Sequence, residues 1–191
     1  GSRGLGDVYK RQGNWTYTFK DLPKYANGQE ITYTVAEEEV TDYTTTYDGS
    51  NITNSYTPGE TSASVTKIWD DADNQDGIRP ESITVNLFAD GTKLKSQSVS
   101  ADADGNWSYS FTDLPKYANG QEITYTVTED AVDGYTTESD GYNFINTHQP
   151  ETTEITGTKT WNDANNQDGK RPESITVILL ANGTEKTRQA V

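Results

Sequence analysis

A direct repeat with a period of 92 residues constrains the fold of this chain more than any other feature of its sequence. The segment Gly13–Val35 recurs almost unchanged at Gly105–Val127, and Thr66–Val85 recurs at Thr158–Val177. Both pairs have the same offset and neither needs a gap. A fixed period of this kind indicates one structural unit per repeat, so the same fold should appear more than once along the chain.

The 191-residue chain therefore holds one complete repeat and two partial ones. We expect residues 61–148 to form the complete repeat, residues 13–56 the C-terminal part of one and residues 152–191 the N-terminal part of another. Stretches rich in Pro, Thr and Glu around residues 57–62 and 149–154 are interpreted as short linkers.

Residues 1–12 belong to no repeat. Within them, Asp7–Gln12 has the sequence DVYKRQ, which is the translation of a transposase end sequence used to prepare DNA libraries. We interpret residues 1–12 as a non-native leader. On this interpretation the chain is a fragment of a longer array of repeats.

Alternation of large and polar side chains predicts β-strands in each repeat. Ile83–Leu87, Trp107–Phe111 and Tyr125–Glu129 all show the period of two that is typical of a half-buried strand. Asp-Gly and Asn-Gly pairs between such runs mark turns that require a positive φ. Six or seven short strands per repeat predict an all-β fold, an antiparallel sandwich of immunoglobulin-like size.

Composition excludes several classes of function. The chain has no cysteine, which rules out disulfides, thiol catalysis and cysteine-based metal sites. Its one histidine, His148, lies at the end of a repeat, where we expect it to be exposed, and leaves little room for a catalytic triad. A net charge of −15 argues against nucleic acid and anionic membranes as partners. We expect no cofactor, no metal, no membrane insertion and no enzyme activity on an external substrate.

The acidic segment Asp70–Gly77 allows two interpretations. Clustered carboxylates are the ligands that calcium prefers, but the segment lacks the spacing of an EF-hand. Its copy at Asn162–Gly169 also replaces Asp70 and Asp73 with asparagine. A solvated turn is therefore favoured over a calcium site.

The same alternation places two charged side chains on inward faces. Lys67 is in phase with Val65 and Trp69, and Glu129 is in phase with Tyr125 and Val127. Burying a charge is costly unless it is neutralised or paired. A lysine that extends to solvent and a solvated glutamate are the ordinary alternatives.

A polar residue near the end of the repeat is less clearly oriented. Asn146 shares its phase with Phe144, although the opposite face, with Ile145, stays open. An ordinary backbone-bonding asparagine is the alternative role. The equivalent positions of the partial repeats hold Glu37, Asn54 and Lys159.

Several strings together resemble a known domain family. TKIWDDADNQDGIRPESITV, GNWSYSFTDLPKYANGQEITYTV and FINTH are similar to the B-type repeat domain of the Cna collagen adhesin, called CnaB. The resemblance implies tandem inverse immunoglobulin-like sandwiches. It also implies a structural stalk or spacer module of an adhesin, outside the cell and anchored to the cell wall of Gram-positive bacteria. Its partners would be neighbouring repeats of the parent chain and a host extracellular protein bound by a separate head domain.

The resemblance further implies a spontaneous isopeptide bond in the complete repeat. The crosslink would join Lys67 to Asn146, with Glu129 as its promoter. An apolar setting would lower the pKa of Lys67 and keep Glu129 protonated. The partial repeats lack a full set, so we expect them to be poorly stable on their own and to be cleaved early by proteases. Pairing between their halves in two chains is left open.

A different class of function is a multivalent module that binds a host protein or glycan. In this alternative, tyrosines with acidic neighbours would form the binding surface, and we expect Tyr117, Tyr135 and Tyr142 to be exposed. Repeated loops fit a multivalent binder as well as a spacer.

Overall fold

The computed structural model describes residues 15–191, so the leader expected over residues 1–12 lies outside the described part. Every regular element within residues 15–191 is a β-strand. This part of the chain contains no helix that is long and apolar enough to cross a membrane. The prediction of an all-β fold is confirmed.

The chain divides into two compact units. Among the described residues, the first comprises residues 15–67, Glu81–Asp130 and Ser139–Phe144, and the second comprises Ile68–Pro80, Ala131–Glu138 and Ile145–Val191. The buried apolar core of the complete repeat belongs to the first unit.

One sheet of the complete repeat has three strands. Its central strand is β6 (Ser82–Ala89), which pairs antiparallel with β11 (Tyr125–Glu129) and with β7 (Thr92–Ser100). β6 and β7 form a hairpin whose turn is Asp90-Gly91, and both turn residues have a positive φ. The strand and turn predicted from alternation and from the Asp-Gly signal are confirmed here.

A second sheet has four strands in the order β12-β13-β5-β8. These strands are β12 (Thr136–Asp140), β13 (Asn143–Thr147), β5 (Glu60–Asp70) and β8 (Trp107–Pro115). A separate hairpin of two short strands follows β8, formed by β9 (Tyr117–Ala118) and β10 (Gln121–Glu122).

β5 has a different relation to each of its two neighbours. It pairs antiparallel with β8 over a register that runs from Glu60 opposite Pro115 to Lys67 opposite Trp107. Toward β13, the bonds advance in the same direction along both strands, as in a parallel pair. They are Thr66 N to Tyr142 O at 3.2 Å and His148 N to Asp70 O at 2.9 Å.

The start of β5 corrects one boundary. We predicted a linker over residues 57–62, but the strand begins at Glu60, and Lys116 N donates to Gly59 O at 3.0 Å. The prediction is wrong for the last three residues, because pairing with β8 draws them into the sheet.

Burial alternates along the strands as the sequence predicts. Ala63, Val65 and Lys67 are buried on β5, whereas the residues between them are exposed. The two sheets contribute to one apolar core, which makes the repeat a sandwich. The buried apolar residues are Ala63, Val65, Ile83, Val85, Leu87, Val99, Trp107, Phe111, Leu114, Tyr125, Val127 and Phe144.

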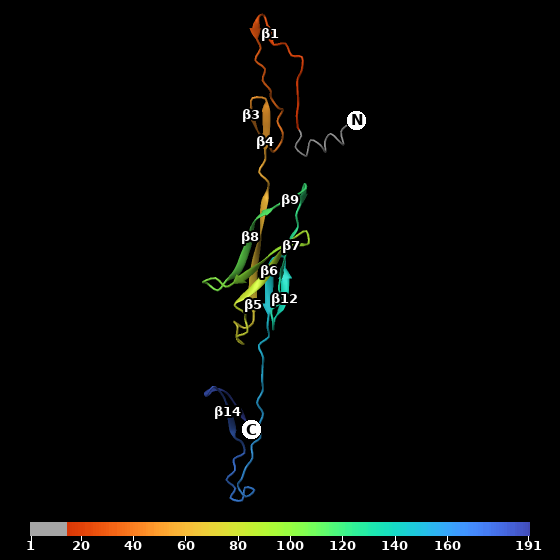
Figure 1. The fold of residues 1–191 in the computed structure, drawn as a ribbon. Coiled ribbons are helices and arrows are strands. Elements are labelled where there is room, and N and C mark those ends of the chain that lie inside the picture. Colours follow the sequence, from red (N-terminus) through yellow and green to blue (C-terminus); the bar gives the residue numbers. More distant parts are fainter. Residues whose placement is uncertain (1–14) are drawn as a thin grey trace. The chain divides into compact units, whose positions relative to one another are not determined.

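In the partial repeats, the described strands form only hairpins (Figure 1). The strand pairs are β1 (Tyr25–Ala26) with β2 (Gln29–Glu30), β3 (Thr44–Asp48) with β4 (Asn51–Ser55), and β14 (Thr176–Ala181) with β15 (Thr184–Ala190). Residues 15–23, 33–37 and 152–162, which correspond to β8, β11 and β5, are not strands. In the partial repeats, strands form where the pairing partner is the next strand along the chain. Segments whose partner in the complete repeat is distant in sequence do not form strands.

The same contrast appears in burial. Trp107 is 7% exposed, whereas its counterpart Trp15 is 68% exposed. Phe111 is fully buried, and its counterpart Phe19 is 70% exposed. Identical side chains therefore form a core only where both sheets are present.

This contrast predicts different effects for one substitution made at two equivalent leucines. Leu87→Ala should lower the free energy of unfolding by roughly 2–5 kcal/mol, because Leu87 is fully buried and its removal leaves a cavity. Leu179→Ala, at the exposed counterpart, should change it by less than about 0.5 kcal/mol. Urea unfolding followed by tryptophan fluorescence measures both. Equal effects would contradict the assignment of the core to the complete repeat.

Candidate functional site

Lys67 and Glu129 meet in the core of the complete repeat. β5 carries Lys67 from the four-stranded sheet, and β11 carries Glu129 from the three-stranded sheet. Lys67 Nζ lies 2.9 Å from Glu129 Oε2, and each side chain is 1% exposed. Burial lowers the pKa of Lys67, and the hydrogen bond and charge of Glu129 oppose that shift. The pair is thus a potential amine nucleophile beside a carboxyl group, screened from water.

Asn146 lies on β13, the strand next to β5 in the four-stranded sheet. Asn146 is fully buried and Phe144 is 2% exposed, whereas Ile145 is 38% exposed. Of the two orientations that the sequence left open, the structure has the one in which Asn146 shares the buried face with Phe144.

The equivalent residues of the partial repeats have other partners. The Thr45 hydroxyl lies 2.8 Å from Asn54 Oδ1 and 3.3 Å from Glu37 Oε1, so it links these two side chains. Lys159 is exposed and lies over the ring of Trp161, 4.6 Å from its centroid.

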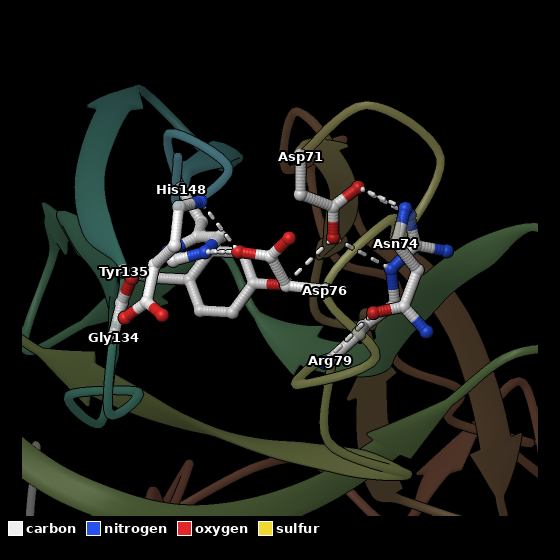
Figure 2. A network of polar contacts seen from close by, with 8 residues as sticks. Asp71, Asn74, Asp76, Arg79, Gly134, Tyr135 and His148 are labelled. Carbon is white, nitrogen blue, oxygen red and sulfur yellow. Dashed lines mark hydrogen bonds and ion pairs between the residues drawn. The ribbon is translucent and has the colours of Figure 1, made fainter. Parts of the chain in front are cut away.

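A network of polar contacts surrounds the loop between β5 and β6 (Figure 2). Arg79 donates from Nη2 to Asp71 Oδ1 at 2.6 Å and from Nε to Asp71 Oδ2 at 3.0 Å. The Tyr135 hydroxyl donates to the same Oδ2 at 2.7 Å. The Arg79 bonds hold the pKa of Asp71 well below its usual range, while burial and Asp71 raise the pKa of Tyr135 to about 12.

The backbone of this loop is left-handed over three consecutive residues. Ala72, Asp73 and Asn74 have φ values of 52°, 55° and 58°. Such conformations are unfavourable outside glycine and need support from neighbouring groups. The Asp71 side chain accepts from Asn74 N at 2.9 Å, and the Asn74 side chain accepts from Arg79 N at 3.0 Å.

The same loop forms in the third repeat without the rest of a sandwich. Asp163 and Arg171 pair at 2.5 Å, and Ala164, Asn165 and Asn166 are again left-handed. In the complete repeat Tyr135 also bonds to this loop, but residues 152–191 include no counterpart of that tyrosine. The loop conformation therefore depends mainly on the residues of the loop itself.

The segment Asp70–Gly77 forms a turn in which most residues are exposed, as favoured, but the Asp71 side chain departs from the expectation because it is not solvated. Asp71 is 2% exposed, and its carboxylate is already neutralised by Arg79. Within residues 15–191 no group of three or more histidine, aspartate or glutamate side chains is placed to hold a metal ion.

Sequence reasoning missed the position of His148. We expected His148 to be exposed, but it is half-buried, with Nε2 2.7 Å from Asp76 Oδ2 and Nδ1 2.9 Å from Gly134 O. This prediction is wrong because both acceptors come from distant loops. The sequence held one signal for the network around Asp71, namely that Asp71 and Arg79 recur as Asp163 and Arg171 in the second copy of the loop.

The tyrosine surface of the binding alternative is mostly absent. Tyr135 is half-buried and donates to Asp71, and Tyr142 is half-buried with its hydroxyl 3.0 Å from Tyr125 O. The expectation that these two are exposed is wrong, since each hydroxyl is bonded within the repeat. Tyr117 is 50% exposed, as expected.

Comparisons with known proteins agree on one family. The family described as Cna protein B-type domain matches residues 5–55, 63–147 and 155–191. A collagen adhesin of Staphylococcus aureus is 52% identical over 176 residues, which are 89% of this chain but only 15% of that protein. The crystal structure of two B repeat units of the S. aureus collagen-binding protein is 50% identical, with a TM-score of 0.60. It covers 94% of this chain, which in turn spans 50% of it.

The Asp71 network makes a prediction about stability and pH. Asp71→Asn should lower the free energy of unfolding at neutral pH by roughly 1.5–3 kcal/mol, because it weakens buried charge-assisted bonds. A depressed pKa means that the contribution of Asp71 is complete above its ordinary value of 3.8 and is lost as the pH falls further. The difference between the parent and the variant should therefore narrow below about pH 4.

Denaturant unfolding at pH 7 and at pH 3 measures this difference. Asp163→Asn, at the half-buried counterpart, is the matched control and should have a smaller effect. A difference that stays constant down to pH 3 would contradict the assigned role of Asp71.

Proposed function

The chain belongs to the family of Cna protein B-type domains, and we propose that it forms part of the stalk of a cell-surface adhesin. Its likeness to a collagen adhesin supports this role. So does the repetition of one period along the chain, which suits a spacer. In this role the repeats lie outside the cell and hold a ligand-binding head away from the cell wall.

We further propose that the complete repeat carries an isopeptide bond between Lys67 and Asn146. The buried pair of Lys67 and Glu129, 2.9 Å apart, is the observation that carries this proposal. A buried asparagine on the strand next to β5 supports it. In a site without water, transfer of one proton from the ammonium to the carboxylate leaves both groups neutral.

The reaction then needs no external enzyme. The neutral amine of Lys67 attacks Cγ of Asn146, while the Glu129 carboxyl donates a hydrogen bond to Oδ1. Glu129 passes a proton from the attacking amine to the departing nitrogen, so ammonia leaves and a secondary amide remains. Fixed orientation of the reacting groups can lower the activation free energy by on the order of 7–11 kcal/mol.

The crosslink would change how the repeat bears load. Lys67 and Asn146 are 79 residues apart, and the chain-entropy treatment of crosslinks gives roughly 4–5 kcal/mol of stabilisation for a loop of that size. It would also join the first long strand of the repeat to the last. Tension applied along the chain would then bypass the intervening strands.

Mass spectrometry of the intact, folded chain tests the bond. We expect the parent to be lighter than its calculated mass by one ammonia, and Lys67→Ala and Asn146→Ala to have their full calculated masses. Lys159→Ala is the matched control, because it changes the equivalent lysine of the partial repeat and should keep the deficit. A folded parent with its full calculated mass would refute the crosslink.

Single-molecule stretching between the ends of the complete repeat tests the stalk role. The parent should show no extension of the segment between Lys67 and Asn146. Lys67→Ala should release that segment, which adds roughly 260–280 Å at about 3.3–3.6 Å per residue. The same extension in parent and variant would show that the repeat does not carry load in this way.

A multivalent binding module is the second candidate. It is favoured by an exposed tyrosine at the same position of two equivalent hairpins, β1-β2 and β9-β10. Tyr117 and Tyr25 are 50% and 58% exposed, and Lys116 and Lys24 lie over their rings. Deleting the repeats from a parent adhesin distinguishes the candidates. Retained ligand affinity with a shorter reach supports the stalk, and lost affinity supports the binding module.

A further inference from the structure

His148 joins three segments of the chain at the end of the complete repeat (Figure 2). It follows β13 directly, and its backbone N donates to Asp70 O at the end of β5. Its ring lies between Asp76, in the loop between β5 and β6, and Gly134, in the loop between β11 and β12. Both contacts join residues that belong to the same compact unit.

The two ring contacts define the protonation state of His148. Gly134 contributes a carbonyl oxygen, which can only accept a hydrogen bond, and an ionised Asp76 carboxylate can also only accept. A neutral imidazole has one N–H, so one of these two acceptors would lose its hydrogen bond from the ring. Only the imidazolium donates to both, at 2.9 Å and 2.7 Å.

Asp76 is ionised for a second structural reason. Its Oδ2 accepts from the backbone N of Glu151 at 2.8 Å, in addition to His148 Nε2. These two donors lower the pKa of Asp76, with the Glu151 bond as the larger cause. One carboxylate oxygen therefore holds both the histidine and the stretch that follows β13.

We propose that His148, Asp76, Gly134 and the Glu151 amide form a pH-dependent clasp that fixes residues 149–151, the stretch leading out of the repeat, to its loops. When His148 loses its proton, one of its two ring bonds is lost. The link between the last strand and the Asp76 loop then weakens, and residues 149–151 gain freedom.

Other charged and titratable groups around the ring determine the direction of the switch. Asp76 and the Glu151 carboxyl favour the imidazolium, and the bond to Gly134 O also raises the pKa of His148 above its ordinary value of 6.5. Tyr135 lies against the ring at 5.5 Å and stays neutral because its own pKa is raised. Arg79, the nearby cation of the network, is already paired with Asp71.

The sign follows from the raised pKa. The clasp contributes fully below pH 6.5, the ordinary value, and its contribution is lost as the pH rises through the higher value of the folded protein. The preceding junction has no such device in this sequence, because Tyr56 and Gly59 stand at the positions of His148 and Glu151. The clasp is thus specific to the segment that follows the complete repeat.

NMR titration of the full chain between pH 5 and pH 9 tests the proposal. The chain has one histidine, so its imidazole signals need no assignment. We expect His148 to titrate above pH 6.5 and the amide shift of Glu151 to follow the same midpoint. A midpoint at or below 6.5, or a Glu151 amide that does not respond, would overturn the clasp.

Variants separate the clasp from a general pH effect. Asp76→Asn should return the His148 midpoint toward its ordinary value, and His148→Gln should abolish the matching titration of the Glu151 amide. Asp168→Asn, at the equivalent position of the third repeat, should change neither. If Asp76→Asn does not fold, the titration of the parent and of His148→Gln still decides the question. An unchanged Glu151 titration in His148→Gln would overturn the proposal.

Discussion

The complete repeat depends on β5 having a strand on each side, neither of which is its neighbour in sequence. β8 lies on one side and β13 on the other, and both must be present before the inward residues of β5 can be buried. In the partial repeat over residues 152–191, the segment that corresponds to β5 is residues 152–162. It has no such partners and is not a strand. Hairpins survive there because closing a short turn costs far less chain entropy than joining distant segments. Non-local pairing thus separates the folded repeat from its fragments.

The Lys67–Glu129 pair lies in the core, where two apolar side chains would be expected to stabilise the fold more than a charged pair does. Removing two charges from water is costly, and apolar replacements of buried ion pairs are often neutral or stabilising. Only 31% of the residues in the whole chain are hydrophobic, so burial of apolar side chains has little surplus to offset such a cost. The chemical role proposed for the pair accounts for its position, because the proton transfer and the attack both require a site without water.

Alternation along strands predicted much of the fold and the orientation of the polar core residues, since both depend on a period of two that is visible locally. Lys67 and Glu129 are buried as their phase requires. The phase of Asn146 was ambiguous in a strand of five residues with large side chains on both faces. The Asp71 network and His148 could not be derived in this way, because left-handed loops have no periodicity and the partners of His148 are 72 and 14 residues away.

The proposed crosslink and the proposed clasp would act on the same end of β13. Asn146 and His148 are two residues apart, so tension entering through residues 149–151 meets the clasp first and the crosslink immediately afterwards. The clasp passes load to the Asp76 loop, which is continuous with the end of β5, and the crosslink passes it to Lys67 on the same strand. Both routes lead into β5, whose other end at Glu60 leaves the repeat toward the preceding one. A single strand would therefore carry the load through the repeat, and the pH would change only how firmly the segment after β13 is held to it.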